Sequence, residues 1–267
     1  MVHLQLRETQ DKRLLCEALQ EEPFTLVLSA GFFGFFAHVG FLQALEELEL
    51  RPQAVIGVSA GALAGGLWAS GMPADELEAE LKNLTRDKFW DPGLPVGGLL
   101  KGIKFHRLLR ELFNRQGVSQ IEDCPIPFQP VAYDILEGRT VGLEKGDIVK
   151  GVRASCAMPL LFRPVRIGWR WYVDGGLHER TGLSFVEQGV PVALHYLAPR
   201  SPWSKPRRAS LDPSRVLGER PGLVIDSLPR LGPFRLGLGG EAISIARRVS
   251  RKWLMAPARP GLHALTN

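Results

Sequence analysis

The chain has 267 residues, 45% of them hydrophobic, and a formal net charge of +5, which is enough apolar material for one α/β domain with appendages. No apolar run approaches the roughly 18 residues of a membrane span, and the polar, acidic N-terminus excludes a secretory signal. Cys16, Cys124 and Cys156 share no metal-ligand spacing and indicate a reducing compartment, so we expect a cytoplasmic protein without a metal centre or cofactor.

The charge is distributed unevenly along the chain. Residues 201–267 hold 12 Lys and Arg against 4 Asp and Glu, whereas residues 1–200 hold 21 against 24. A basic segment of this kind contacts anionic lipid headgroups, nucleic acid or water. Because the arginines are dispersed and no nucleic-acid-binding module is recognisable, we expect no nucleic-acid partner.

The first part of the chain alternates predicted strands and helices. A short helix over 9–20 precedes a strand over 24–28. A Gly-containing loop over 29–34 then leads to a helix over 38–48, whose apolar residues share one face. A second strand over 54–56 runs directly into another helix-prone stretch.

The middle of the chain is richer in strands. Amphipathic helices over 74–84 and 104–114 flank a loop rich in Gly and Pro. A short helix over 151–157 stops at Met158-Pro159. Further strands are expected over 130–134, 139–144, 162–167, 170–173 and 190–197, the last of which closes the core.

The alternation of strands and helices over 24–197 predicts an α/β fold with a mainly parallel sheet that helices cover on both faces. Beyond residue 199 the composition changes to Pro, Arg, Ser and Gly. We therefore expect a long connection over 199–239, followed by a basic helix and tail over 240–267.

A serine stands at a sharp predicted turn between a strand and a helix. Gly57, Ser59 and Gly61 form a G-x-S-x-G pattern there, the arrangement that exposes a nucleophilic hydroxyl. Both glycines are expected because the turn is strained and a Cβ at either position would crowd the neighbouring chain. A Gly-rich connection with an incidental serine is the alternative, since the pattern fixes only three positions.

A second motif, SAGFFG over 29–34, follows the first predicted strand. Its backbone amides, at Gly31, Phe32, Phe33 and Gly34, would form an oxyanion hole together with Ala60. The loop lacks both nucleotide-binding glycine patterns, so we expect no nucleotide there. A tight turn without a ligand is the alternative.

A third motif, Asp174-Gly175-Gly176, also follows a predicted strand. Burial raises the pKa of a carboxyl, which would make Asp174 a usable base for the serine. The two glycines would let the backbone come close enough for direct contact. A common Asp-Gly turn is the alternative. Because ligands bind at the carboxyl ends of strands in parallel sheets, the three motifs are expected at one edge.

Taken together, the motifs resemble those of patatin-like phospholipases. The loop SAGFFG with the AHVG after it, the elbow GVSAG, the segment ASCAMP over 154–159 and the DGG have that family's order and spacing. The resemblance covers about residues 24–198. It implies a three-layer α/β/α fold with a catalytic domain over 1–198, in which a serine–aspartate dyad hydrolyses lipid acyl esters. By that resemblance Ser59 is the nucleophile and Asp174 the base.

The chain departs from the family pattern in two places. The family's loop is often Gly-Gly-Gly-x-Arg/Lys-Gly, whereas Ser29, Ala30 and Phe33 stand at three of those positions. The donors are backbone amides, so the hole can survive, but Ala30 restricts any position that needs a positive φ. After the DGG the chain reads LHERTG over 177–182 instead of the frequent Asn-x-Pro. These changes bear on rate and substrate choice more than on reaction type.

Three histidines bear on the mechanism. His178, four residues after Asp174, is the candidate third member of a conventional Ser-His-Asp triad. His38 is expected to be packed or hydrogen-bonded at the start of its helix, and His195 to be a core residue within its strand.

Several apolar side chains have two interpretations. The aromatic cluster beside the proposed hole, Phe32 to Phe36, is either packed core or a wall for an acyl chain. Leu99, Leu100 and Ile103 could form a lid or a membrane-touching edge. The helix over 241–254 either packs on the sheet with a wet basic face or makes peripheral contact with an anionic membrane.

The sequence thus supports three functions. The first is a phospholipase, lysophospholipase or carboxylesterase that acts through a serine–aspartate dyad. The second is a conventional Ser-His-Asp hydrolase. The third is a catalytically silent protein that binds lipid or scaffolds membranes, which the altered oxyanion loop suggests.

Overall fold

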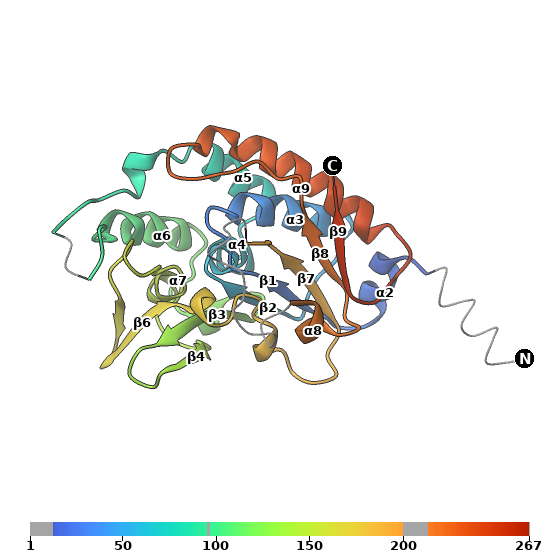
Figure 1. The fold of residues 1–267 in the computed structure, drawn as a ribbon, viewed down its shortest axis with the longest axis horizontal. Helices are drawn as coiled ribbons and strands as arrows, with labels where there is room; N and C mark the ends of the chain where they lie inside the picture. The colour runs from blue at the N-terminus through green and yellow to red at the C-terminus, as the bar shows by residue number, and fades with distance from the viewer. Residues whose placement is uncertain (1–12, 95–96, 200–212, 267) are drawn as a thin grey trace, which may run out of the picture.

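A mixed β-sheet forms the centre of the molecule (Figure 1). The computed structural model describes residues 13–94, 97–199 and 213–266. Over these residues the sheet has nine strands in the order β5-β6-β3-β2-β1-β7-β8-β9, with β4 paired to β3. The strands are β1 Thr25–Leu28, β2 Ala54–Val58, β3 Phe128–Asp134, β4 Arg139–Gly142, β5 Val165–Ile167, β6 Arg170–Asp174, β7 Val192–Tyr196, β8 Gly222–Ile225 and β9 Leu262–Leu265.

Most neighbouring strands run parallel, which confirms the predicted sheet. The parallel pairs are β1–β2, β1–β7, β2–β3, β7–β8 and β8–β9, whereas β4, β5 and β6 join by antiparallel pairing. The direction of strand addition reverses at β1, because β2 and β3 lie on one side of it and β7 to β9 on the other. In open α/β sheets such a reversal opens a crevice between the loops at the carboxyl ends of the strands.

Helices cover the sheet on both faces, unequally. Leu26 and Leu28 of β1 belong to the larger core, which is shared with the long helices, whereas Val27 belongs to a smaller core on the opposite face. That second face is covered by α8 and short 3-10 helices rather than by long helices. The α-helices are α2 Leu15–Glu21, α3 Phe35–Glu47, α4 Ala60–Ala69, α5 Ala74–Lys82, α6 Ile103–Arg115, α7 Ile148–Ser155, α8 Pro213–Leu217 and α9 Gly239–Leu254.

Single-turn 3-10 helices occupy several connections between these elements. They are η1 Arg86–Lys88, η2 Ile121–Asp123, η3 Gly175–Leu177, η4 Leu183–Phe185 and η7 Leu236–Leu238. The three-layer α/β/α arrangement is therefore confirmed, with one thick and one thin helical layer.

Strands β8 and β9 lie where the sequence predicted none. The expectation that the strand over 190–197 closes the core is wrong, since β8 pairs with β7 and β9 with β8. Each has only four residues and β8 stands among Pro, Gly and Arg, so neither shows the usual strand pattern. Part of the expected connection, residues 200–212, lies outside the described residues. The division at residues 198 and 239 stays a prediction, although the sheet crosses both boundaries.

Helix α9 packs along α3 with its apolar face inward. Ala242, Ile245 and Trp253 are buried there, and a Cβ on Gly40 of α3 would lie 2.2 Å from the carbonyl oxygen of Ile243. Figure 1 shows the two helices stacked on the same side of the sheet. The packing interpretation is therefore confirmed, and contact of the basic face with an anionic membrane stays a prediction.

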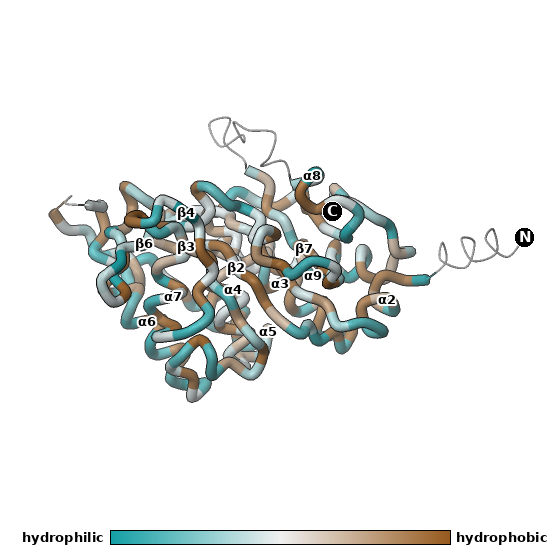
Figure 2. The backbone as a smooth tube through the Cα atoms, turned by 90° about the horizontal axis from the view of Figure 1, so that it is seen from below, coloured by the Kyte–Doolittle hydropathy of each residue, from teal (hydrophilic) through white to brown (hydrophobic). Residues whose placement is uncertain are grey.

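The outer helices alternate apolar and polar residues along their length, as Figure 2 shows for α5, α6 and α9. This alternation is the pattern of helices that bury one face against a core. Among the described residues, none of the helices has the length and hydropathy needed to cross a bilayer.

Candidate active site

Ser59 lies at the turn between β2 and α4 in a strained backbone conformation, with φ 54° and ψ −112°. The turn depends on two very close approaches. A Cβ on Gly61 would lie 2.0 Å from the carbonyl oxygen of Leu28, and one on Gly57 would lie 2.6 Å from Cα of Ala62. Since real Cβ atoms do not tolerate such distances to backbone atoms, both positions require glycine.

The hydroxyl of Ser59 contacts Asp174 directly. Ser59 Oγ donates to Asp174 Oδ2 at 2.6 Å, and the amide of Gly176 donates to Oδ1 at 2.7 Å. Asp174 ends β6, which pairs with β3, the strand next to β2. His178 is exposed and stacks on Tyr133, with ring centroids 4.3 Å apart. Within the described residues it makes no hydrogen bond to the serine or the aspartate.

Burial tunes the carboxyl of Asp174 toward use as a base. The side chain is 3% exposed, and desolvation raises its pKa to about 6, against opposing effects of the Ser59 hydroxyl, the Gly176 amide and the charge of Arg180. A carboxyl with such a pKa is mostly ionised at neutral pH and a stronger base than an exposed aspartate.

The two glycines after Asp174 leave room for neighbouring segments. A Cβ on Gly175 would lie 2.6 Å from the carbonyl oxygen of Val131, and one on Gly176 would lie 2.6 Å from Cβ of Ala30. The methyl group of Ala30 thus packs where Gly176 has no side chain. This contact explains how the loop accommodates alanine at that position.

Residues at the end of α7 and directly after it fix the backbone of the serine. The amide of Ser59 donates to Ser155 Oγ at 2.9 Å, and Ser155 Oγ donates to the carbonyl oxygen of Val131 at 2.6 Å. Cys156 Sγ contacts the carbonyl oxygen of Ser59 at 3.2 Å. The segment 154–159 carries a recognisable motif, but no local pattern indicates a role for Ser155 or Cys156.

The SAGFFG loop turns tightly before α3. Its positive φ falls at Phe33, at 55°, and not at Ala30. The amide of Gly34 donates to the carbonyl oxygen of Gly31 at 2.8 Å, so Gly34 cannot serve an oxyanion without breaking this turn. Within the described chain, the amides of Gly31, Phe32, Phe33 and Ala60 have no protein acceptor. These four remain the candidate donors.

Two buried histidines hold the start of that loop. His38 Nε2 lies 2.9 Å from the carbonyl oxygen of Ser29, and His38 Nδ1 lies 2.9 Å from His195 Nδ1. Burial lowers the pKa of His38 to about 4 and that of His195 well below its usual range, so both are neutral at pH 7. A carbonyl oxygen only accepts, so His38 Nε2 carries the proton and donates it to Ser29. His38 Nδ1 is then an acceptor, and His195 donates to it from Nδ1.

Arg180 and Leu197 hold the same loop from the other side. The carbonyl oxygen of Arg180 accepts from the amide of Ala30 at 2.8 Å, and its Nη2 donates to the carbonyl oxygen of Ala30 at 3.2 Å. A Cβ on Gly34 would lie 2.1 Å from Leu197 Cδ1, and one on Gly31 would lie 2.5 Å from the same atom. Neither Arg180 nor Leu197 was singled out by the sequence analysis, because nothing local marks them.

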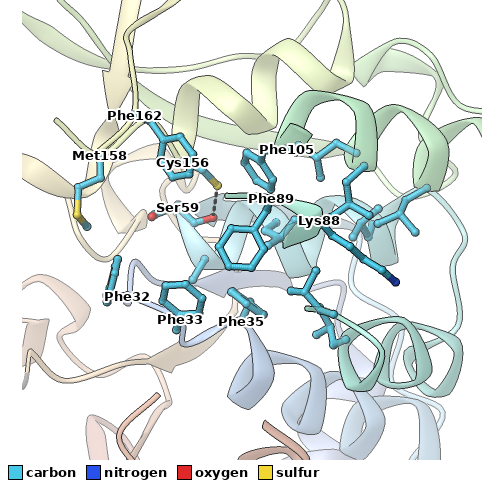
Figure 3. Close-up of a pocket in the computed structure, with 18 of the residues that line it drawn as sticks. Phe32, Phe33, Phe35, Ser59, Lys88, Phe89, Phe105, Cys156, Met158 and Phe162 are labelled. Carbon is cyan, nitrogen blue, oxygen red and sulfur yellow. Dashed lines mark hydrogen bonds between the residues drawn. The ribbon is translucent and has the colours of Figure 1, made fainter. Parts of the chain in front are cut away.

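A cavity of about 120 Å³ begins at Ser59 and runs between α4, α5 and α6. Figure 3 shows Phe35, Phe89 and Phe105 on one side of the serine and Phe32 and Met158 on the other, with Phe33 between Phe32 and Phe35. Its walls are almost entirely apolar, and apolar faces of the amphipathic helices α5 and α6 contribute leucines. Phe36, by contrast, is fully buried in the core, which confirms packing for that residue, whereas a wall for an acyl chain stays a prediction for the others.

A larger cavity of about 580 Å³ meets the first one at Ser59 and Asp174. It lies beneath the SAGFFG loop and is lined by segments that follow β1, β7 and β8. Polar side chains contribute to its wall, including Arg180 and Arg230. The site therefore offers an apolar and a polar compartment on either side of one hydroxyl.

Other predicted positions lie outside the two cavities. Leu99 is 55% and Ile103 is 52% exposed, whereas Leu100 is buried. The amide of Leu99 donates to the carbonyl oxygen of Leu160, a residue that is itself 83% exposed. Over the described residues there is no cluster of three His, Cys, Asp or Glu side chains that could hold a metal ion.

Comparison with known proteins agrees with this geometry. Residues 26–185, more than half of the chain, match the family model of patatin-like phospholipases. The chain belongs to the patatin-like phospholipase family. The matched part begins within β1 and includes the serine, the aspartate and the glycines around them.

Relatives in sequence are named as NTE family proteins. An uncharacterized NTE family protein of Mycobacterium tuberculosis (strain ATCC 25618 / H37Rv) is 34% identical over 155 residues, 57% of this chain and 42% of the relative. Lysophospholipase NTE1 of Cryptococcus neoformans var. neoformans serotype D is 30% identical over 172 residues, 62% of this chain and 10% of the relative. The chain therefore spans less than half the length of these two relatives.

The patatin-like fold also occurs in solved structures. VipD from Legionella pneumophila superposes with a TM-score of 0.54 at 16% sequence identity, over 67% of this chain and 51% of that protein. At this identity the likeness concerns the fold alone.

Proposed function

We propose that this protein hydrolyses acyl esters of lipids, with Ser59 as the nucleophile and Asp174 as the base. The observation that carries the proposal is the 2.6 Å hydrogen bond between the two side chains, at the junction of an apolar and a polar cavity. Family membership supports lipid acyl hydrolase activity, and the relative named lysophospholipase supports a phospholipid or lysophospholipid substrate.

The first half-reaction transfers the acyl group to the enzyme. Ser59 Oγ attacks the ester carbonyl carbon while its proton passes to Asp174 Oδ2. The negative charge that develops on the carbonyl oxygen is met by donors among the free amides of Gly31, Phe32, Phe33 and Ala60, each worth about 3 kcal/mol in well-studied oxyanion holes. The C–O bond to the alcohol then breaks, and the departing oxygen takes the proton from Asp174.

The second half-reaction releases the fatty acid. Water gives a proton to Asp174 as its oxygen attacks the acyl carbon, and the serine regains its proton when the Oγ–acyl bond breaks. No imidazole takes part, because the hydrogen bond of Ser59 runs directly to the carboxylate. The raised pKa of Asp174 supports both transfers, since the same group must accept a proton and then return it.

The test combines probe labelling with turnover of a soluble ester. An organophosphonate is expected to add its phosphonyl group to Ser59, as identified by mass spectrometry of the labelled peptide. Ser59→Ala and Asp174→Asn are expected to lower kcat at least about 10³-fold on a p-nitrophenyl ester. The matched controls are Ser244→Ala on the exposed side of α9 and Asp123→Asn, which are expected to retain full activity.

The outcomes separate the three functions. Full activity of both site variants would refute the dyad. Loss of activity in His178→Ala equal to that in Ser59→Ala would favour a conventional triad. Binding of lipid vesicles without labelling or turnover would favour a catalytically silent lipid-binding protein.

A further inference from the structure

The two cavities that meet at Ser59 and Asp174 differ in the charges along their walls. Glu80 of the smaller cavity forms an ion pair with Arg115 at 2.8 Å, and Lys88 donates to a main-chain carbonyl. Since both charges already have partners and the rest of the wall is apolar, this cavity suits a hydrocarbon chain.

The larger cavity carries charges that the protein leaves open. Its wall holds Arg180, Arg230 and one further acid besides the base, Asp226. Arg180 Nε is buried and has no hydrogen-bond partner. Arg230 is exposed, and no ion pair to it exists among the described residues. Arg180 donates to the carbonyl oxygen of Ala30 and its charge acts on Asp174, but neither guanidinium forms an ion pair with a carboxylate among the described residues. Such groups favour binding of an anion, and of phosphate in particular.

The larger cavity also lies where α/β sheets bind ligands. Its wall is built from the segments after β1, β7 and β8, on the side of β1 where the order of strands reverses. Loops that follow neighbouring parallel strands at such a reversal diverge and leave a crevice. The sheet topology therefore accounts for the cavity independently of its charges.

The chemistry assigns each cavity one half of the ester. The alcohol must take its proton from Asp174 as it leaves, so it lies on the side of that residue. Gly176, Leu177 and Arg180, which follow Asp174 in the chain, line the larger cavity only. Leu63 on the helix after Ser59 lines the smaller cavity only. The acyl chain thus enters the smaller cavity, and the alcohol occupies the larger one.

We propose that the larger cavity holds the alcohol half of the substrate and that Arg230, together with Arg180 in the same wall, selects alcohols that carry a phosphate group. This inference rests on the proposed ester hydrolysis and specifies its substrate as phosphate-bearing glycerol esters rather than neutral acylglycerols. Arg230 is the specificity residue, because its guanidinium is exposed and has no fixed role in the loop.

The test uses three soluble esters of the same hexanoyl chain: those of sn-glycerol 3-phosphate, glycerol and p-nitrophenol. We expect the wild-type protein to have a kcat/KM for the phosphate ester about tenfold above that for the glycerol ester, the effect of one charge-assisted hydrogen bond. Arg230→Ala is expected to remove this preference and to leave the other two substrates within twofold. Arg230→Glu is expected to lower kcat/KM for the phosphate ester further, and Arg230→Lys is expected to retain most of the wild-type preference.

The matched control is Arg235→Ala, an exposed arginine on the same segment that lines neither cavity. It is expected to behave as wild type on all three esters. An equal loss on all three esters in Arg230→Ala, or a wild-type protein that favours the glycerol ester, would overturn the proposal.

A binding measurement keeps the proposal separate from the proposed activity. sn-Glycerol 3-phosphate is expected to slow organophosphonate labelling of Ser59 in the wild type but not in Arg230→Glu, whereas glycerol has no effect. Protection by inorganic phosphate equal to that by sn-glycerol 3-phosphate would overturn the assignment to an alcohol half. If no ester is hydrolysed, the proposed function fails, but calorimetry still decides the inference about the cavity. sn-Glycerol 3-phosphate is titrated into the Ser59→Ala protein with and without Arg230→Glu. Binding that depends on Arg230 supports the inference, and absence of binding refutes it.

Discussion

The serine elbow and the SAGFFG loop lie side by side, yet different parts of the chain hold them in place. The elbow is fixed by its own glycines, because backbone atoms of β1 and α4 press against Gly57 and Gly61. The loop is fixed by side chains outside it, which include His38, Arg180 and Leu197, and by the main-chain carbonyl of Arg180.

This difference explains which of the two motifs departs from the family pattern. A backbone contact leaves no freedom, so the elbow keeps its glycines. A contact with a side chain can adjust, because a side-chain atom such as Leu197 Cδ1 can move. The loop therefore keeps its amides while its side chains differ.

The largest expected effect comes from breaking the elbow. Gly61→Ala would place a Cβ 2.0 Å from the carbonyl oxygen of Leu28, and we expect it to lower the free energy of unfolding by at least about 3 kcal/mol with loss of activity. Urea unfolding followed by circular dichroism measures the change. The control on the same helix is Gly65→Ala, whose nearest neighbour is a side-chain atom of Val55 at 3.0 Å and which is expected to stay within about 1 kcal/mol of wild type. A stable, active Gly61→Ala protein would contradict this account.

The second effect separates the two regions by pH. We expect kcat/KM to fall about tenfold per unit below an apparent pKa of about 6, because only ionised Asp174 accepts the serine proton. The buried histidines of the loop stay neutral across this range, since the pKa of His38 is about 4. A pH–rate profile on a p-nitrophenyl ester tests this, and a rate that stays constant down to pH 5 would refute it.

The raised pKa of Asp174 also makes the stability of the fold depend on pH. Because the pKa of Asp174 is raised in the folded state, the folded protein binds more protons than the unfolded one between about pH 4 and pH 6. This group therefore destabilises the fold as pH rises through that window. We expect Asp174→Asn to raise the free energy of unfolding at pH 7 by up to about 3 kcal/mol, as measured by urea unfolding. Near pH 4 the free energies of unfolding of wild type and variant are expected to converge.

The smallest expected effect comes from the loop. Gly34→Ala would bring a Cβ to 2.1 Å from Leu197 Cδ1, a side-chain atom that can move, so we expect a loss of about 1–2 kcal/mol. Leu197→Ala removes the clash, and the double variant is expected to be more stable than the sum of the single changes by about 1 kcal/mol. If the changes in the free energy of unfolding of the two single variants simply add in the double variant, the loop is held by backbone contacts, as the elbow is.

What the sequence predicted follows the same division. Ser59 with its glycines, Asp174 with Gly175 and Gly176, and the strands before them carry local signals, and the structure brings the serine and the aspartate within 2.6 Å. The buried states of His38 and His195 are also confirmed. Their mutual hydrogen bond was not predicted, because it needs α3 and β7 side by side.

The missed features depend on residues far apart in the chain. Arg180 and Leu197 act on a loop about 150 residues earlier, through contacts that no local pattern indicates. The pairing of β8 and β9 was hidden by their short length. The donor role expected for Gly34 failed because its amide already closes the turn to Gly31.

The close seat of α9 on Gly40 limits how the arginine-rich end of this chain can meet a lipid surface. Because the apolar face of α9 packs against α3, its exposed face carries three arginines and Lys252 together with Glu241 and Ser244. Insertion of α9 into a bilayer would require its separation from α3, which would expose the core between the two helices to solvent.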